Sequence, residues 1–351
     1  MQRAASEPTI AMTLAKQRLA SGEHQAALHY FQLAAFNGDD AAALHAVKLR
    51  QRLEGNLATA LWLERQLQSG KLQNPQLPQD VLAELGLWFK PVPASNGFRA
   101  VSGCQLTLQP VVVDQAGIEH WQYLQHQWQQ DKQLSALPVC FLPQHVVNST
   151  KLRCSEDAAS RINCDYGVLQ PLVSEGGFTQ LLVAAGSGGA SYNNGILQLP
   201  VKASLALLRH EFMHILGFID EYALSAATAA SVCKSGQVYP NLVVGQDAEA
   251  YLQHWPGTKI MLTEVETCRE VGLKAYRVTA ETNLMWRYEL ELPELYFNVA
   301  QRVLKQPEKI MPVQYYFAYL ARQQQDWPLW QRYMQQAADL GYANAEQALA
   351  P

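Results

Sequence analysis

The run HEFMH at positions 210–214 constrains the fold of this chain more than any other feature. It lies in an apolar segment whose periodicity predicts a helix over about 201–216. Residues four apart on a helix lie one above the other, so His210 and His214 would point the same way. Burying these two imidazoles and the Glu211 carboxylate without partners would be costly. We therefore expect the two histidines to bind a metal ion.

The spacing of the neighbouring residues suits Zn²⁺. Two imidazoles on one helix face can each donate a nitrogen to one Zn²⁺ at about 2.0–2.1 Å. Glu211 follows the first histidine directly, so it could take a proton from a metal-bound water without ligating the metal. Gly217 can end the helix in a left-handed conformation and let the chain turn back. Asp220 would then supply the third ligand and leave the fourth position open to water.

The pattern HExxHxxGxxD over 210–220 resembles the metzincin superfamily of zinc peptidases. The usual metzincin signature is HExxHxxGxxH, and Asp replaces the third His in the snapalysin-like branch. The triplet DEY at 220–222 also looks like a motif of the IgA-peptidase-like family, where it lies one residue further from the helix. That shift leaves Glu221 as an alternative third ligand, and His254 is another.

The resemblance implies three further features. Metzincins have a Met-turn beneath the metal, and the segment NLMW at 283–286, with Met285, is the candidate here. Tyr288 would take the place of a tyrosine that stabilises the transition state in some metzincins, although its spacing differs by one residue. The segment 189–199 would form an edge strand that lines the cleft and pairs with an extended peptide. The dipeptide NG at 194–195 is also typical of a hairpin turn.

The middle of the chain alternates strand and helix signals. Ahead of the HEFMH segment we predict one helix, at 115–134, with one strand before it and three after it. The predicted strands are 104–113, 137–147, 179–185 and 196–199. This order predicts an α+β fold in which helices pack against a twisted mixed sheet. The resemblance implies that the sheet is metzincin-like and that the HEFMH helix is the active-site helix.

Helical segments flank this middle part. The stretches 26–42 and 330–345 resemble the helix–turn–helix units of tetratricopeptide and SEL-type repeats. We therefore expect a helical repeat-like domain over 1–95, a zinc metallopeptidase domain over 96–290 and a repeat-like helical segment over 291–351. Such repeats could bind a protein partner on a concave surface, or they could simply bury apolar area against the middle domain.

Six cysteines without a CxxC pair argue against a thiolate zinc site and favour disulfides. Six cysteines allow about fifteen pairings. We predict the pairs Cys104–Cys140, Cys154–Cys164 and Cys233–Cys268. This pairing would place the protein in the periplasm or outside the cell. The alternative is a cytoplasmic protein with six buried free thiols.

Composition narrows the partners. The net charge is −4 and no Lys/Arg cluster is present, so we expect no nucleic-acid binding. No apolar run is long enough for a transmembrane segment. The sequence therefore favours a zinc-dependent peptidase, with Glu211 activating the water and a peptide or protein as substrate. The alternatives are a helical-repeat adaptor with an inactive metallopeptidase-like domain and a zinc hydrolase of a non-peptide amide.

Overall fold

A mixed β-sheet occupies the centre of the molecule. The computed structural model describes residues 7–73, 75–93 and 95–350. The strand order is β2-β1-β4-β6-β5, with β3 also paired to β1. Neighbouring strands are parallel except β5, which runs antiparallel to β6 at the edge. The strands are β1 (Leu106–Val112), β2 (Val139–Phe141), β3 (His145–Val146), β4 (Gln180–Ala184), β5 (Ser191–Asn193) and β6 (Ile196–Leu199).

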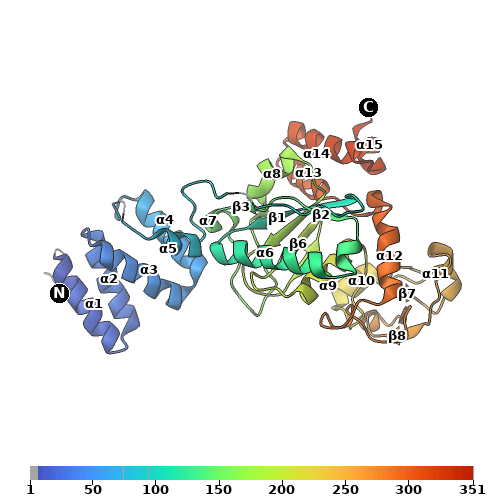
Figure 1. Cartoon of the computed structure of the whole chain (residues 1–351), viewed down its shortest axis with the longest axis horizontal. Helices are drawn as coiled ribbons and strands as arrows, with labels where there is room; N and C mark the ends of the chain where they lie inside the picture. Colours follow the sequence, from blue (N-terminus) through green and yellow to red (C-terminus); the bar gives the residue numbers. More distant parts are fainter. Residues whose placement is uncertain (1–6, 74, 94, 351) are drawn as a thin grey trace.

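Helices cover both faces of this sheet. Alternate residues of a strand point to opposite faces, so Leu182 and Leu181 of β4 belong to different hydrophobic cores. The core around Leu182 includes residues of α6 (Gln115–Gln130) and α9 (Leu205–Ile215). The core around Leu181 is closed by the C-terminal helices α13 (Val313–Gln323), α14 (Trp327–Asp339) and α15 (Ala343–Leu349). Figure 1 shows α6 crossing the sheet and the C-terminal helices at the top.

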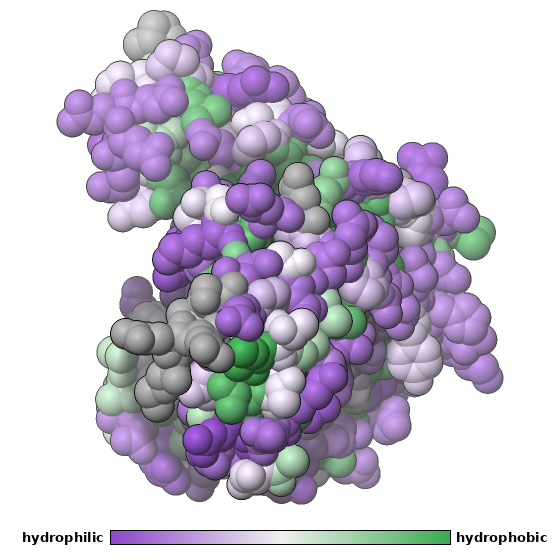
Figure 2. Space-filling view, turned by 90° about the vertical axis from the view of Figure 1, so that its left-hand side faces the viewer, coloured by the Kyte–Doolittle hydropathy of each residue, from purple (hydrophilic) through white to green (hydrophobic). Residues whose placement is uncertain are grey.

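The N-terminal helices form a separate layer at one end of the molecule (Figure 1). Their side chains, including Phe31 and Leu63, build a hydrophobic core of their own. Hydrophilic residues dominate the outward face at this end of the molecule (Figure 2). The helices are α1 (Pro8–Ala20), α2 (His24–Phe36), α3 (Asp40–Glu54), α4 (Asn56–Gln68) and α5 (Gln79–Glu84).

The segment after α9 forms a small second sheet of order β7-β9-β8. Sequence patterns gave no elements for residues 223–282, because three-residue strands are too short to show a periodicity. Its strands are β7 (Leu242–Val244), β8 (Thr263–Val265) and β9 (Ala275–Arg277). The remaining helices are α7 (Ser149–Leu152), α8 (Gln170–Glu175), α10 (Ala226–Val232), α11 (Ala248–His254) and α12 (Glu294–Leu304).

Several predicted features are confirmed. The fold is α+β, and the three disulfides pair as predicted: Cys104–Cys140, Cys154–Cys164 and Cys233–Cys268. These disulfides are compatible with an oxidising compartment. Within the described ranges, every helix is too short or too polar to span a bilayer. The division into three domains and a partner for the repeat-like helices stay predictions.

Three predicted elements differ from the structure. The helix expected over 115–134 ends at Gln130, because Asp131 adopts an extended conformation. The strand expected over 137–147 is split into β2 and β3, with Pro143, which has no N–H to donate, in the gap. The helix expected from 201 begins at Leu205, because the Ser204 side chain caps it by accepting a hydrogen bond from the Leu207 N–H at 3.1 Å.

Candidate metal centre

Helix α9 has an apolar face that packs in the core and a polar face that lines a cleft. Phe212 and Leu208 are fully buried in the core. The Phe212 and Trp128 rings pack edge to face, with 5.1 Å between their centroids. This packing fixes the rotation of the helix, so His210 and His214 face a cleft on its other side. Gly217 follows with φ +80°, a conformation that glycine adopts without strain. The chain then turns back towards the helix.

That turn brings Asp220 to the two histidines. The Nε2 atoms of His210 and His214 lie 3.2 Å apart. The Asp220 Oδ1 atom lies 3.2 Å from the first Nε2 atom and 3.3 Å from the second. Ligands placed tetrahedrally about 2.0–2.1 Å from a zinc ion would be separated by about 3.3–3.4 Å. The three atoms therefore have the spacing of three corners of a zinc coordination shell.

The other ring nitrogens support this reading. His210 Nδ1 lies 2.8 Å from the Leu284 carbonyl oxygen, and His214 Nδ1 lies 2.8 Å from the Phe218 carbonyl oxygen. A carbonyl only accepts, so each Nδ1 carries the hydrogen and donates it. Each Nε2 then keeps its lone pair for the centre of the cluster. Metal-ligating histidines are usually oriented in this way.

Asp220 fits a metal ligand because one of its carboxylate oxygens has no hydrogen-bond partner in the described part of the chain. Its Oδ1 atom is buried and has no hydrogen-bond partner among the described residues. Burial alone would raise the pKa of Asp220, but the two histidines outweigh it and hold that pKa well below its usual range. Burial would lower the pKa of His214, but Asp220 outweighs it and raises the pKa to about 9. The carboxylate of Asp220 thus favours a positive charge between the two rings.

Glu211 lies beside the cluster with one free carboxylate oxygen. The residue is 6% exposed, and its Oε2 atom is buried with no hydrogen-bond partner among the described residues. Burial raises the pKa of Glu211, while the charges of His214, His210 and Arg161 oppose that rise. A carboxylate with a raised pKa and an open oxygen is suited to take a proton from a water in the cleft.

The alternative ligands lie elsewhere. Glu221 is buried beneath the cleft, where its carboxylate accepts hydrogen bonds from Asn241, Asn283 and Tyr296 at 2.6–3.2 Å. His254 ends α11, and its Nδ1 lies 2.9 Å from the Ala250 carbonyl oxygen. Among the described residues, the grouping of metal-ligating side chains contains Asp220 and neither of these two.

The segment predicted as a Met-turn lies under the centre. The Leu284 carbonyl accepts the His210 hydrogen bond, and the Met285 carbonyl accepts one from the Glu221 N–H at 2.8 Å. Met285 itself is fully buried in the core that contains α9. The segment thus contacts both the helix and the chain that carries Asp220.

A tyrosine near the centre comes from a different position than expected. Tyr288 is 39% exposed and is not among the residues that line the cleft. Tyr222 lines the cleft instead, and its hydroxyl donates a hydrogen bond to Asp220 Oδ2 at 2.8 Å. Tyr222 belongs to the triplet DEY at 220–222, which was the one signal in the sequence that pointed to it.

The cleft encloses about 260 Å³, and one wall is the sheet edge. Ser191 and Tyr192 of β5 line it, as does Ala190 just before the strand. Among the described residues, strand β5 pairs with β6 alone, through a two-residue turn in which Asn194 and Gly195 both have positive φ. The other side of β5 is therefore an open edge beside the centre. Arg161 also lines the cleft, although no motif in the sequence pointed to it.

Comparisons with protein-family models, with curated proteins and with solved structures found no match for this chain.

Proposed function

We propose that the chain is a zinc-dependent peptidase of the metzincin type, in which His210, His214 and Asp220 hold the metal. The observation that carries this proposal is the convergence of two Nε2 atoms and one Oδ1 atom within 3.2–3.3 Å of one another, beside the free oxygen of Glu211. A bound zinc ion would polarise the substrate carbonyl and make a water more acidic.

Each residue of the site has a role in this chemistry. Glu211 takes a proton from the attacking water and passes it to the leaving amine. Strand β5 offers its open edge to an extended peptide, which would hold the scissile bond over the centre. The intact Glu211 favours a hydrolase over an adaptor with an inactive domain, since an adaptor has no need of a base. The three disulfides favour the periplasm or the extracellular space as the place of action.

Zinc content and Glu211→Gln test this function together. Purified without chelators, the protein should contain one zinc per chain by mass spectrometry. Glu211→Gln should retain the zinc but lose hydrolysis of a peptide library by a factor on the order of 10²–10⁴. Zinc far below one per chain, or equal cleavage by the variant, would contradict the proposal.

A further inference from the structure

The Arg161 side chain brings a permanent positive charge to the cleft. Of the fifteen residues that line it, Arg161 is the single Lys or Arg, and it lies with Glu211 and Tyr222 around the same space. Its side chain is exposed and makes no hydrogen bond or ion pair with a described residue. A guanidinium that faces a cleft without a partner has its donors free for a ligand.

The backbone on either side of Arg161 is held in place. Ser160 accepts a hydrogen bond from the Gly189 N–H at 2.8 Å, and the Ile162 N–H donates one to the Gly189 carbonyl at 3.1 Å. A Cβ at Gly188 would lie only 2.5 Å from the Ser160 carbonyl oxygen, so this close approach requires glycine. Gly189 is two residues before β5, so the backbone of Arg161 is held beside the start of β5.

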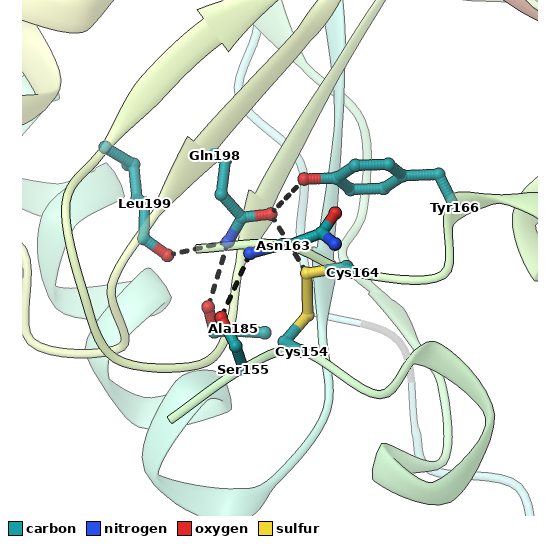
Figure 3. The surroundings of a disulfide bond; sticks show 8 residues. All are labelled: Cys154, Ser155, Asn163, Cys164, Tyr166, Ala185, Gln198 and Leu199. Atoms are coloured by element: carbon teal, nitrogen blue, oxygen red, sulfur yellow. Dashed lines mark hydrogen bonds between the residues drawn. A yellow bond between two sulfur atoms is a disulfide. The ribbon is translucent and has the colours of Figure 1, made fainter. Parts of the chain in front are cut away.

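A disulfide closes the loop that carries Arg161. The Cys154–Cys164 bond joins the two ends of the loop, and Ser155 and Asn163 next to it exchange hydrogen bonds of 2.9 and 3.1 Å (Figure 3). The buried Gln198 of β6 ties the loop to the sheet. Its Oε1 accepts from the Tyr166 hydroxyl at 2.8 Å, and its Nε2 donates to the Ala185 carbonyl at 2.9 Å. The backbone that carries Arg161 is therefore held by a disulfide and by hydrogen bonds next to β5.

The free cation points to an anionic group on the substrate. The guanidinium group matches a carboxylate in geometry and charge, because it can donate two parallel hydrogen bonds. A peptide carries carboxylates on Asp and Glu side chains and at its C-terminus. The acidic residues Glu211 and Asp220 would otherwise repel such a group from the cleft.

Resting on the proposed peptidase function, we propose that Arg161 selects peptides with a carboxylate close to the scissile bond. The side chain binds that carboxylate at the start of β5 and so aligns the chain on the open edge. It is a specificity-determining residue and takes no part in the proton transfers.

Cleavage specificity is the first test. Peptides that differ only in Asp or Asn at one position, both with an amidated C-terminus, report a side-chain carboxylate. Neutral peptides with a free or an amidated C-terminus report the terminal one. We expect one of these carboxylate forms to be preferred in kcat/KM, and Arg161→Gln to reduce that preference by about tenfold or more. Arg161→Glu should instead favour Lys at the same position, whereas the exposed Arg99→Gln should keep the original preference.

Binding without turnover is the second test. The Glu211→Gln change prevents hydrolysis during the binding measurement. A chelator in the buffer removes any metal that could contact the peptide carboxylate directly. Calorimetry with acetyl-Ala-Ala-Asp-Ala-Ala-amide and its Asn counterpart, and with the acid and amide forms of a neutral peptide, should then show tighter binding of the preferred carboxylate form. The additional Arg161→Gln change should abolish that difference.

Equal affinities in both peptide pairs, or a preference that survives Arg161→Gln, would overturn the role of Arg161. Zinc-dependent cleavage of neutral peptides would then leave the peptidase function standing. Conversely, a carboxylate preference in binding that depends on Arg161, without any zinc or hydrolysis, would overturn the peptidase function alone.

Discussion

Two adjacent carboxylates, Asp220 and Glu221, serve the same site in opposite ways. The Asp220 side chain lines the cleft, whereas the Glu221 side chain is buried beneath it. Asp220 faces the two histidines with a free oxygen, whereas Glu221 is 1% exposed and surrounded by donors. Asn283 connects Glu221 to the Met285 segment, since its Nδ2 donates to the Glu221 carboxylate and its Oδ1 accepts from the Met285 N–H.

The matched amide variants should separate these roles. Asp220→Asn replaces a charged ligand, so we expect zinc affinity to fall by more than about a hundredfold. Glu221→Gln would replace one carboxylate oxygen with an NH2 donor among the donors of Asn283, Asn241 and Tyr296, so it should lower the free energy of unfolding by about 1–3 kcal/mol and keep one zinc per chain. Zinc titration and urea unfolding check both outcomes. Loss of zinc in Glu221→Gln alone would make Glu221 the third ligand.

Tyr222 should act on the metal through Asp220. Its hydroxyl orients the carboxylate by the 2.8 Å hydrogen bond to Oδ2, so Tyr222→Phe should weaken zinc binding about tenfold. Tyr288→Phe is the matched control, because Tyr288 does not line the cleft. Competition with a zinc-sensitive dye measures both affinities. An unchanged affinity in Tyr222→Phe would argue against this orienting role.

At the scale of elements, the site depends on loops that rigid elements hold in place. The disulfide Cys154–Cys164 closes a loop with a sequence separation of 10. Chain-entropy arguments assign such a loop a stabilisation of roughly 2–3 kcal/mol. The same loop carries Arg161 to the cleft, so its rigidity bears on both stability and substrate choice.

Replacing Cys154 and Cys164 together by Ser should lower the free energy of unfolding by roughly 2–3 kcal/mol. It should also reduce the preference for a substrate carboxylate, because Arg161 would no longer be fixed beside β5. The pair Cys104 and Cys140 offers a matched control: its removal should cost stability but keep the preference. Denaturant unfolding and the Asp/Asn peptide pair measure the two effects. An equal loss of preference in both double variants would contradict the link.

Sequence reasoning succeeded for elements and residues that carry a local signal. Strand β6 matches its predicted span of 196–199, and His210, His214 and Asp220 come together as their spacing indicated. It failed where the structure depends on distant contacts. Arg161 reaches the cleft only because its loop packs on Gly188 and Gly189, and no local pattern encodes that contact.

At the scale of the whole molecule, the proposed metal site lies on elements that share one hydrophobic core. Helix α9, the Met285 segment and α12 share one hydrophobic cluster with α6 and the sheet. A metal that binds only the folded state stabilises it by mass action, by about 2.7 kcal/mol at a concentration of 100 Kd.

Metal removal should therefore lower the thermal stability of the protein. Dialysis against a chelator should reduce the Tm by several degrees, and added Zn²⁺ should restore it. Asp220→Asn protein should show little response to either treatment, because its site is incomplete. Differential scanning calorimetry at fixed protein concentration measures the shift. A Tm that does not change in the wild-type protein would contradict a metal bound at this core.

The C-terminal helices also set the order in which a nascent chain can mature. Phe317 of α13, Tyr333 of α14 and Ala345 of α15 complete the core on one face of β4. A chain still held by the ribosome at those residues leaves that face of the sheet exposed, and the edge strand β5 belongs to the same sheet. The sheet that forms one wall of the cleft can therefore be completed only after residues 313–349 have emerged.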